Sequence, residues 1–251
     1  MEINGISAIV TGAASGLGAA TAAALAGRGA TVIGLDLPTS IEKASPPKGV
    51  RLVGSDVTSE EQVLAALATV PEYAPLRLVV NCAGIGPARK TLSSKGVHEL
   101  DLFRKVVEIN LVGTFNVLRL AADVISKTEP LADEQRGLIV NTASVAAYDG
   151  QIGQIAYASS KGGVVGMTLP AARDLSQYGI RVNTIAPGII DTPLLAALGP
   201  EVNAALAAGV PFPKRLGRPD EYAQLVLMLA EHDYLNGETI RMDGALRMPP
   251  K

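Results

Sequence analysis

Three residues with the chemistry for proton transfer stand close together in the sequence. Tyr157 and Lys161 are four residues apart in Tyr-Ala-Ser-Ser-Lys, and Ser144 precedes Tyr157 by thirteen residues. On a helix, positions four apart share a face, so the phenol and the ammonium should lie side by side. A positive neighbour favours the phenolate, and the pKa of Tyr157 is therefore expected to fall. With the Ser144 hydroxyl binding a substrate oxygen, the pattern predicts proton transfer to or from an alcohol or carbonyl.

The first forty residues predict the unit that positions such a site beside a dinucleotide. An apolar strand over 6–11 leads into the glycine-rich segment 12–18, an alanine-rich helix over 16–28, and a second strand over 30–36. Glycines let the backbone approach a pyrophosphate, and a helix N-terminus offers it free N–H groups. Asp36 ends the second strand, where a carboxylate can accept hydrogen bonds from ribose hydroxyls. The alternative interpretations are a plain tight turn and a solvated carboxylate.

Strand and helix patterns alternate along the rest of the chain, with no repeat and no low-complexity linker. Strands are expected over 6–11, 30–36, 50–55, 76–81, 136–143, 179–186 and 237–242. Helices are expected over 16–28, 59–70, 99–127, 154–177 and 218–231. This order predicts one α/β domain over 1–251, a Rossmann-type, doubly wound, parallel seven-stranded sheet with helices on both faces. The Pro-bounded segment 189–218 is typical of a substrate lid.

The candidate residues cluster at one edge of the predicted sheet. Asp36, Asp56, Asn81, Ser144 and Pro187 all lie at the carboxyl ends of expected strands. In open parallel sheets, ligands bind at that edge. Asp56 has a second possible role, which is to cap the helix that follows it.

Charge and hydropathy narrow the possible partners. A net charge of −2 argues against a chain built to coat nucleic acid. No apolar run reaches the roughly 20 residues that a membrane span needs, so no membrane partner is expected. The first strand begins almost at once, which leaves no room for a cleaved leader and predicts a cytoplasmic protein. An uncleaved targeting signal is the alternative.

Cysteine and histidine content narrow the possible chemistry. Cys82 is the only cysteine, so an internal disulfide is impossible, and its place after a buried strand favours a packed side chain over a redox thiol. His98 and His232 lie away from every motif, which argues against a histidine- or metal-dependent dehydrogenase. No metal ligand is therefore assigned.

Five ordered motifs together resemble the short-chain dehydrogenase/reductase family. They are Thr11-Gly12-x-x-x-Gly16-x-Gly18; Asn81-Cys82-Ala83-Gly84, with Cys in place of the family's second Asn; Asn110 in Ile-Asn-Leu-Val-Gly; Ser144 with Tyr157 and Lys161; and Pro187-Gly188-Ile189-Ile190-Asp191-Thr192. The resemblance covers nearly the whole chain, and it implies a catalytic tetrad of Asn110, Ser144, Tyr157 and Lys161.

The resemblance also implies the role of each member of the tetrad. Tyr157 would exchange the proton, Ser144 would hold the substrate oxygen, and Lys161 would lower the pKa of Tyr157 and bind the nicotinamide ribose. Asn110 would fix a water in a proton relay. The alternative for Asn110 is a buried side chain that binds backbone groups.

The implied cofactor is NAD, because the Asp36 carboxylate would repel the 2′-phosphate of NADP. The cofactor-binding residues implied are Gly12, Ser15, Gly16, Leu17, Gly18, Asp36, Asp56, Val57, Cys82, Ala83, Gly84, Tyr157, Lys161, Pro187, Gly188, Ile190 and Thr192. Ser144, Gln151, Gln154 and Tyr157 are the candidate contacts of a small-molecule substrate, although either glutamine could simply face solvent.

Further stretches, such as Val210-Pro-Phe-Pro213, resemble the subgroup of the family that oxidises 3-hydroxyacyl-CoA and hydroxysteroids, and imply a homotetramer. Leu246 and Met248 look exposed and so available for assembly. Arg89, Lys90 and Lys95 of the loop 86–98 are candidate contacts for the nucleotide end of CoA, with solvated surface residues as the alternative. An NADPH-dependent 3-oxoacyl-carrier-protein or carbonyl reductase, and a binding subunit of a larger assembly, are the competing functions.

Overall fold

Seven parallel strands form the central sheet in the part of the chain that the computed structural model describes, residues 1–46, 48–196 and 199–250. Their order across the sheet is β3-β2-β1-β4-β7-β8-β9, and every neighbouring pair is parallel. The strands are β1 (Ser7–Thr11), β2 (Thr31–Asp36), β3 (Val50–Gly54), β4 (Leu76–Asn81), β7 (Gly137–Thr142), β8 (Ile180–Pro187) and β9 (Thr239–Met242). The order reverses beside β1, which creates the crevice where open sheets of this kind bind ligands.

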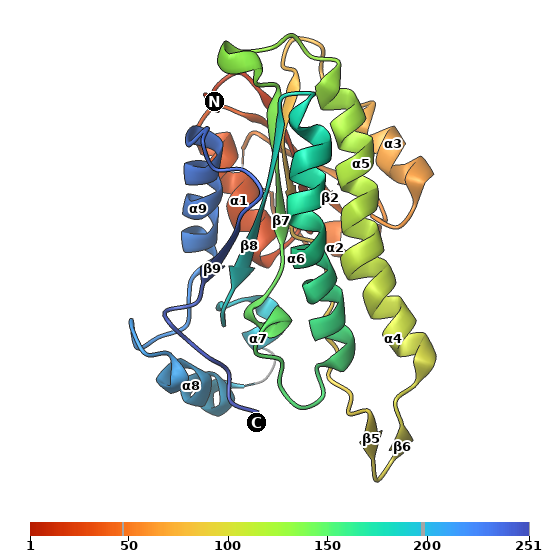
Figure 1. Ribbon diagram of the computed structural model, residues 1–251, viewed down its shortest axis with the longest axis vertical. Coiled ribbons are helices and arrows are strands. Elements are labelled where there is room, and N and C mark those ends of the chain that lie inside the picture. Colours follow the sequence, from red (N-terminus) through yellow and green to blue (C-terminus); the bar gives the residue numbers. More distant parts are fainter. Residues whose placement is uncertain (47, 197–198, 251) are drawn as a thin grey trace.

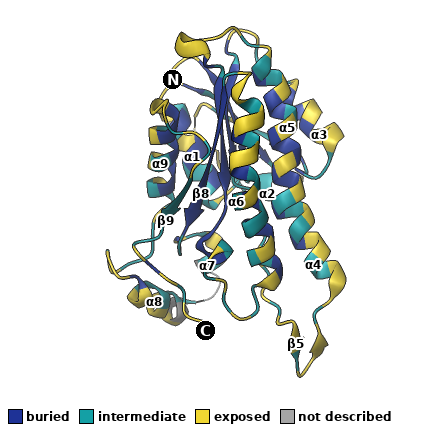
Figure 2. Cartoon of the chain, viewed as in Figure 1, coloured by how far each residue is buried: buried dark blue, intermediate teal, exposed yellow. Residues whose placement is uncertain are grey.

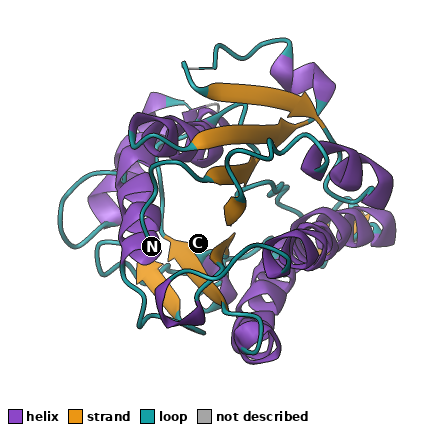
Figure 3. Cartoon of the chain, turned by 90° about the horizontal axis from the view of Figure 1, so that it is seen from above, coloured by secondary structure: helices purple, strands orange, loops and turns teal. Residues whose placement is uncertain are grey.

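Helices cover both faces of this sheet, as the view from above shows (Figure 3). They are α1 (Gly16–Gly27), α2 (Pro38–Ile41), α3 (Glu60–Leu67), α4 (Leu100–Val107), α5 (Gly113–Ser126), α6 (Ile155–Ser176), α7 (Pro193–Ala196), α8 (Pro200–Gly209) and α9 (Pro219–Glu231). Short π- or 3₁₀-turns are η1 (Glu108–Val112), η2 (Ala132–Glu134) and η3 (Val145–Ala147).

Two hydrophobic cores sandwich the sheet, and the alternation of side chains along each strand supplies both. Val140 of β7 packs with α1 and α9, whereas Ile139 faces α3, α5 and α6. Every residue of β1, β4, β7 and β8 is buried, which explains their almost continuous apolar sequences. Figure 1 shows α1 and α9 on one side of the strands and α4, α5 and α6 on the other.

The predicted helix 99–127 is interrupted at its centre. The chain runs as α4 and α5 joined by the π-helical turn η1. By length and composition alone, Leu100–Ser126 could cross a membrane, but half of its most apolar window is buried. Val117 and Ile125 pack in the core against the sheet, as residues of a core helix do.

Two segments expected as loops carry regular structure. Within 86–98, β5 (Leu92–Ser93) and β6 (Gly96–Val97) form a two-stranded antiparallel hairpin that projects from the molecule (Figure 1). Within 189–218, the segment predicted as a lid, the chain forms α7 and α8, and residues 197–198 lie outside the described residues.

Candidate active site

The predicted catalytic residues come together at the carboxyl end of β7. Tyr157 and Lys161 lie on α6, and Ser144 follows β7 and begins η3, where its Oγ accepts a bond from the Ala146 N–H at 3.1 Å. Lys161 is 4% exposed, and its Nζ donates to the Thr142 carbonyl at 2.7 Å. A buried ammonium, a phenol and a hydroxyl therefore share one corner of the sheet.

The expected lowering of the Tyr157 pKa is wrong for this structure. Burial raises the pKa of Tyr157 above its ordinary value, and a hydrogen bond from Ser144 only partly opposes that effect. The Lys161 ammonium points to the Thr142 carbonyl and lies 5.8 Å from the centre of the phenol ring. Burial also lowers the pKa of Lys161 to about 8. Desolvation of both groups therefore outweighs their mutual attraction.

Asn110 sits at the centre of η1 and is fully buried. Its Oδ1 accepts a bond from the Ile85 N–H at 2.8 Å, and its Nδ2 donates to the Ile85 carbonyl at 2.8 Å and to Ser160 Oγ at 3.0 Å. The side chain therefore braces the loop after β4 against α6, as the alternative interpretation expected. The relay water stays a prediction. A π-turn inserts one extra residue into a helix and is frequent at functional sites.

The glycine-rich loop fits a dinucleotide pyrophosphate. Gly12 has φ +67, and a Cβ there would lie 3.0 Å from the Ala83 nitrogen; a Cβ at Gly18 would collide with the Gly12 carbonyl. The loop is thus packed too closely for side chains at these two positions. Ser15 precedes α1 in an extended conformation and makes no side-chain capping bond to it. The first-turn N–H groups therefore face a ligand position without a side-chain partner from Ser15.

Two carboxylates at neighbouring strand ends take different roles. Asp36 Oδ2 accepts a bond from the Ala14 N–H at 2.9 Å and Oδ1 one from the Leu37 N–H at 2.8 Å, so its carboxylate lies against the glycine-rich loop. Asp56 binds the Thr58 N–H and hydroxyl at 2.9 and 2.7 Å. Ser59, not Asp56, caps α3, which corrects one of the two expectations for Asp56.

The loop after β4 joins the cofactor loop to the catalytic corner. Thr11 Oγ1 accepts bonds from the N–H groups of both Cys82 and Ala83 at 3.0 Å. A Cβ at Gly84 would lie 3.1 Å from Asn110 Oδ1 and 3.6 Å from Lys161 Nζ. Burial raises the pKa of the Cys82 thiol, which keeps it protonated and fits the expectation of a packed side chain.

Comparison with known proteins gives the family. A family model described as enoyl-(acyl carrier protein) reductase matches residues 12–246. The 3-hydroxyacyl-CoA dehydrogenase type-2 of Drosophila melanogaster is 57% identical over 96% of this chain and 97% of its own. The rat protein of that name is 52% identical over 99% of this chain and 98% of its own. The Mycobacterium avium crystal structure of that name covers both chains fully, with 43% identity and a TM-score of 0.91.

The chain belongs to the short-chain dehydrogenase/reductase family. It is therefore an oxidoreductase, and enzymes of this family use a nicotinamide cofactor. The matched region contains all five motifs apart from Thr11, the first residue of the first motif. The family assignment and the site geometry therefore concern the same residues.

In this short-chain dehydrogenase/reductase, the segment predicted as a lid closes on itself at its base. Ile190 forms a parallel bridge with Gly217; the Gly217 N–H donates to the Ile189 carbonyl at 3.0 Å and the Asp191 N–H to the Gly217 carbonyl at 2.8 Å. Thr192 reaches the glycine-rich loop, since a Cβ at Gly16 would lie 3.6 Å from Thr192 Cγ2. Thr192, one of the predicted cofactor residues, therefore lies beside the glycine-rich loop, and its contact with a cofactor stays a prediction.

The ends of β8 and β9 complete this edge of the sheet. Pro187 ends β8, and the Gly188 N–H donates to the Met242 carbonyl at 2.9 Å. On the other side, Val57 is held by Asn116 Nδ2, which donates to its carbonyl at 2.9 Å. The Leu17 side chain packs against the core shared by α1 and α9, and a contact of its backbone with the cofactor stays a prediction.

Gln151 and Gln154 brace their own loop. The Gln154 side chain accepts from the Gln151 N–H at 3.0 Å, and Gln151 Nε2 donates to the Pro249 carbonyl at 3.1 Å. Both line a cavity of about 400 Å³ beside Lys90 and Ile152. Contact of either glutamine with substrate stays a prediction.

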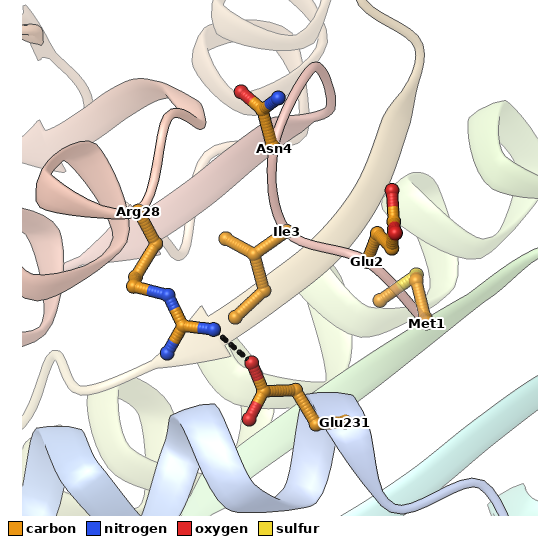
Figure 4. Close-up of a pocket in the computed structure, with 6 residues that line it drawn as sticks. All are labelled: Met1, Glu2, Ile3, Asn4, Arg28 and Glu231. Carbon is orange, nitrogen blue, oxygen red and sulfur yellow. Dashed lines mark hydrogen bonds and ion pairs between the residues drawn. The ribbon is translucent and has the colours of Figure 1, made fainter.

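A second cavity, of about 510 Å³, lies at the opposite edge of the sheet. It is lined by Met1, Glu2, Ile3, Asn4, Arg28 and Glu231, and the ion pair between Arg28 and Glu231 crosses it (Figure 4). No residue of the predicted tetrad lines it, so this cavity is separate from the candidate site. Within the described ranges, no three His, Cys, Asp or Glu side chains gather closely enough to hold a metal ion.

Proposed function

We propose that this enzyme interconverts 3-hydroxyacyl-CoA and 3-oxoacyl-CoA with NAD as cofactor. The observation that carries the proposal is the convergence of Ser144, Tyr157 and Lys161 at the strand edge that also holds the glycine-rich loop and Asp36. Relatives bearing the name 3-hydroxyacyl-CoA dehydrogenase type-2 match this chain from end to end, which supports the acyl-CoA as substrate.

Each polar group at the site has a defined task in the proposed reaction. In oxidation, Tyr157 acts as the phenolate and takes the proton from the substrate hydroxyl, and in reduction the Tyr157 phenol gives a proton to the carbonyl oxygen. Ser144 donates a hydrogen bond to the same substrate oxygen. A nicotinamide cofactor supplies the hydride acceptor when bound. Lys161 contributes a positive charge behind the phenol and a donor for the cofactor ribose, and the Gly12–Gly18 loop and Asp36 hold the adenosine half.

The competing enzyme function, an NADPH-dependent 3-oxoacyl-carrier-protein or carbonyl reductase, conflicts with Asp36. A 2′-phosphate would approach a carboxylate that already faces the Ala14 and Leu37 N–H groups. Oxidation of hydroxysteroids by the same site is a proposed side activity. A main role as a binding subunit conflicts with the complete tetrad.

An assay of three substrates, a 3-hydroxyacyl-CoA, a hydroxysteroid and a carrier-protein thioester, each with NAD(H) and with NADP(H), separates these functions. Fastest turnover of the carrier-protein thioester with NADPH would overturn the proposal.

Binding of CoA by the loop 86–98 is part of the proposal, with two of its three basic residues as the preferred contacts. Arg89 makes a two-point ion pair with Glu99, with nitrogen–oxygen distances of 2.9 and 2.6 Å, so it holds the hairpin in place. Lys90 and Lys95 are exposed, and Lys90 borders the 400 Å³ cavity. These two ammonium groups are therefore the better candidates for the CoA phosphates.

Replacing Arg89, Lys90 and Lys95 together by Ala is expected to raise KM for a CoA thioester by about 10-fold while sparing kcat. Phosphate contacts made equally in the ground and transition states affect KM alone, and two exposed contacts at about 0.7 kcal/mol each correspond to about 10-fold. KM for a small uncharged alcohol should not change. The matched control is Lys127→Ala with Arg173→Ala, which removes two exposed charges elsewhere. Equal responses of both substrates would exclude the loop as a CoA site.

A homotetramer is proposed from the outer faces of the helices. Leu100, Val112, Phe115 and Leu169 are large apolar residues with 41–59% of their surface exposed, on α4, η1, α5 and α6. Figure 2 shows exposed residues along the outward sides of α5 and α6. Apolar faces of this kind favour a closed symmetric oligomer.

Leu246, expected to be exposed, is 4% exposed and belongs to the core instead, because the tail folds back on the chain.

Light scattering at micromolar concentration should give the mass of four chains for the wild type. Phe115→Glu with Leu169→Glu is expected to give a smaller species, because charges would replace apolar contacts. Tyr73→Glu alters an exposed aromatic residue outside these helices and should leave the mass unchanged. A wild-type monomer would contradict the proposal. A cytoplasmic location is proposed as well, because Cys82 is the only cysteine and an unpaired thiol suits a reducing compartment.

A further inference from the structure

Tyr222 of α9 is linked to the catalytic corner by buried hydrogen bonds. Its side chain is fully buried, and its hydroxyl lies 2.7 Å from Thr142 Oγ1. Cys82 Sγ donates to the same hydroxyl at 3.8 Å. The Tyr222 hydroxyl therefore lies between two buried partners, the Cys82 thiol and the Thr142 hydroxyl, and either hydroxyl of the Tyr222–Thr142 pair could be the donor. A buried phenol has few partners to choose from, so this bond fixes both side chains.

Thr142 carries this link from one face of the sheet to the other. It is the last residue of β7, and its side chain points to the face of α1 and α9, as Leu138 and Val140 do. Its carbonyl accepts the 2.7 Å bond from Lys161 Nζ, which comes from α6 on the opposite face. Ser144 follows two residues later. One residue thus connects Tyr222 to two members of the tetrad.

Tyr222 is suited to hold this corner and unsuited to exchange protons itself. Burial raises its pKa well above the ordinary value, so the phenol stays neutral and keeps its hydrogen bond with Thr142. Its ring packs in the core with Val226, which fixes the position of the hydroxyl. The neighbouring Cys82 thiol is also kept neutral by burial. The charged group beside these hydrogen-bonded side chains is Lys161, which contacts the carbonyl of Thr142 and not its hydroxyl.

We propose that Tyr222 is a positioning residue that acts through Thr142 to set the place of Lys161 and Ser144. The inference rests on the proposed catalytic role of Lys161. Without the Tyr222 hydroxyl, Thr142 Oγ1 would lack its buried partner, and the end of β7 would lose its tie to α9 while keeping its backbone pairing with β8. The Lys161 ammonium would then lose an acceptor of defined position, and displacements of this kind lower turnover strongly.

A double-mutant cycle tests the inference. Tyr222→Phe and Thr142→Val each remove one hydroxyl of the pair, and each is expected to lower kcat by about 10-fold with little change in KM for NAD. The double variant should be no slower than either single variant, because both break one bond. Thr142→Ser restores the hydroxyl and should restore most of the turnover. Because Thr142→Val leaves the tyrosine in place, the test survives if Tyr222→Phe folds poorly.

The matched control is Thr184→Val. Thr184 and Thr168 form a buried hydroxyl pair at 2.6 Å between β8 and α6, and neither contacts the tetrad. Its loss should lower the melting temperature as the Thr142 change does, with kcat unchanged. Additive effects in the cycle, or unchanged kcat in Tyr222→Phe, would overturn the inference. Lys161→Ala separates the two proposals: wild-type turnover in that variant would refute the proposed site itself.

Discussion

Replacing Tyr157 by Phe is expected to lower kcat by about 10²–10⁴-fold. The change removes the oxygen that exchanges the substrate proton and keeps the ring, so NAD affinity should be nearly unchanged. A loss in kcat and kcat/KM together, without a loss of cofactor binding, is the signature of a group that acts only in the transition state. Steady-state oxidation of 3-hydroxyacyl-CoA and a separate titration with NADH measure the two effects.

Tyr178→Phe is the control for the Tyr157 experiment. Tyr178 follows the other end of α6, is 45% exposed, and makes no side-chain hydrogen bond among the described residues. Its variant should retain wild-type turnover. If Tyr157→Phe also keeps near-wild-type turnover, another group carries the proton and the assignment fails.

The second large effect is on the choice of cofactor. The wild type should prefer NAD to NADP by roughly 100-fold in kcat/KM, because a carboxylate that can bind ribose hydroxyls repels a 2′-phosphate. Asp36→Asn removes the charge while keeping an oxygen for the Ala14 or Leu37 N–H. This variant should lose most of the preference, through both weaker NAD binding and better NADP binding.

Glu42→Gln is the matched control, since it neutralises an exposed carboxylate a few residues further along the chain. It should leave the NAD/NADP ratio unchanged. Equal kcat/KM for the two cofactors in the wild type would show that Asp36 does not select the cofactor. An unchanged NAD/NADP ratio in Asp36→Asn would assign the selectivity to another group.

Much of this fold follows from local patterns in the sequence. The predicted strands were confirmed within two residues at each end, because strands buried on both faces are apolar throughout and are bounded by turn residues. The interruption of the helix 99–127 was missed. A π-turn adds one residue to a helix without changing composition, so η1 leaves no periodic signal that would separate it from α4 and α5.

The candidate site was predicted as a set of residues, whereas the predicted shift of the Tyr157 pKa was wrong. The four-residue spacing does put Tyr157 and Lys161 on one helix, but burial and the Thr142 carbonyl decide their pKa values. Both depend on what the rest of the chain packs around α6. Asn110 was identified from its motif, whereas its bonds to Ile85 and Ser160 depend on tertiary packing.

Contacts between distant segments had no signal in the sequence. Arg89 pairs with Glu99 across a hairpin expected as a loop, and Tyr222 lies 80 residues from Thr142. A lone tyrosine in an amphipathic helix such as α9 is indistinguishable from an ordinary core residue until the sheet brings Thr142 beside it.

The central claim is that this site moves a hydride from C3 of a 3-hydroxyacyl-CoA to NAD. Oxidation of a 3-hydroxyacyl-CoA that carries deuterium on C3, followed by mass spectrometry of the cofactor, tests it most directly. We expect the deuterium to appear in the reduced cofactor, in amounts equal to the 3-oxoacyl-CoA formed. No reduced cofactor, or reduced cofactor without deuterium, would contradict it.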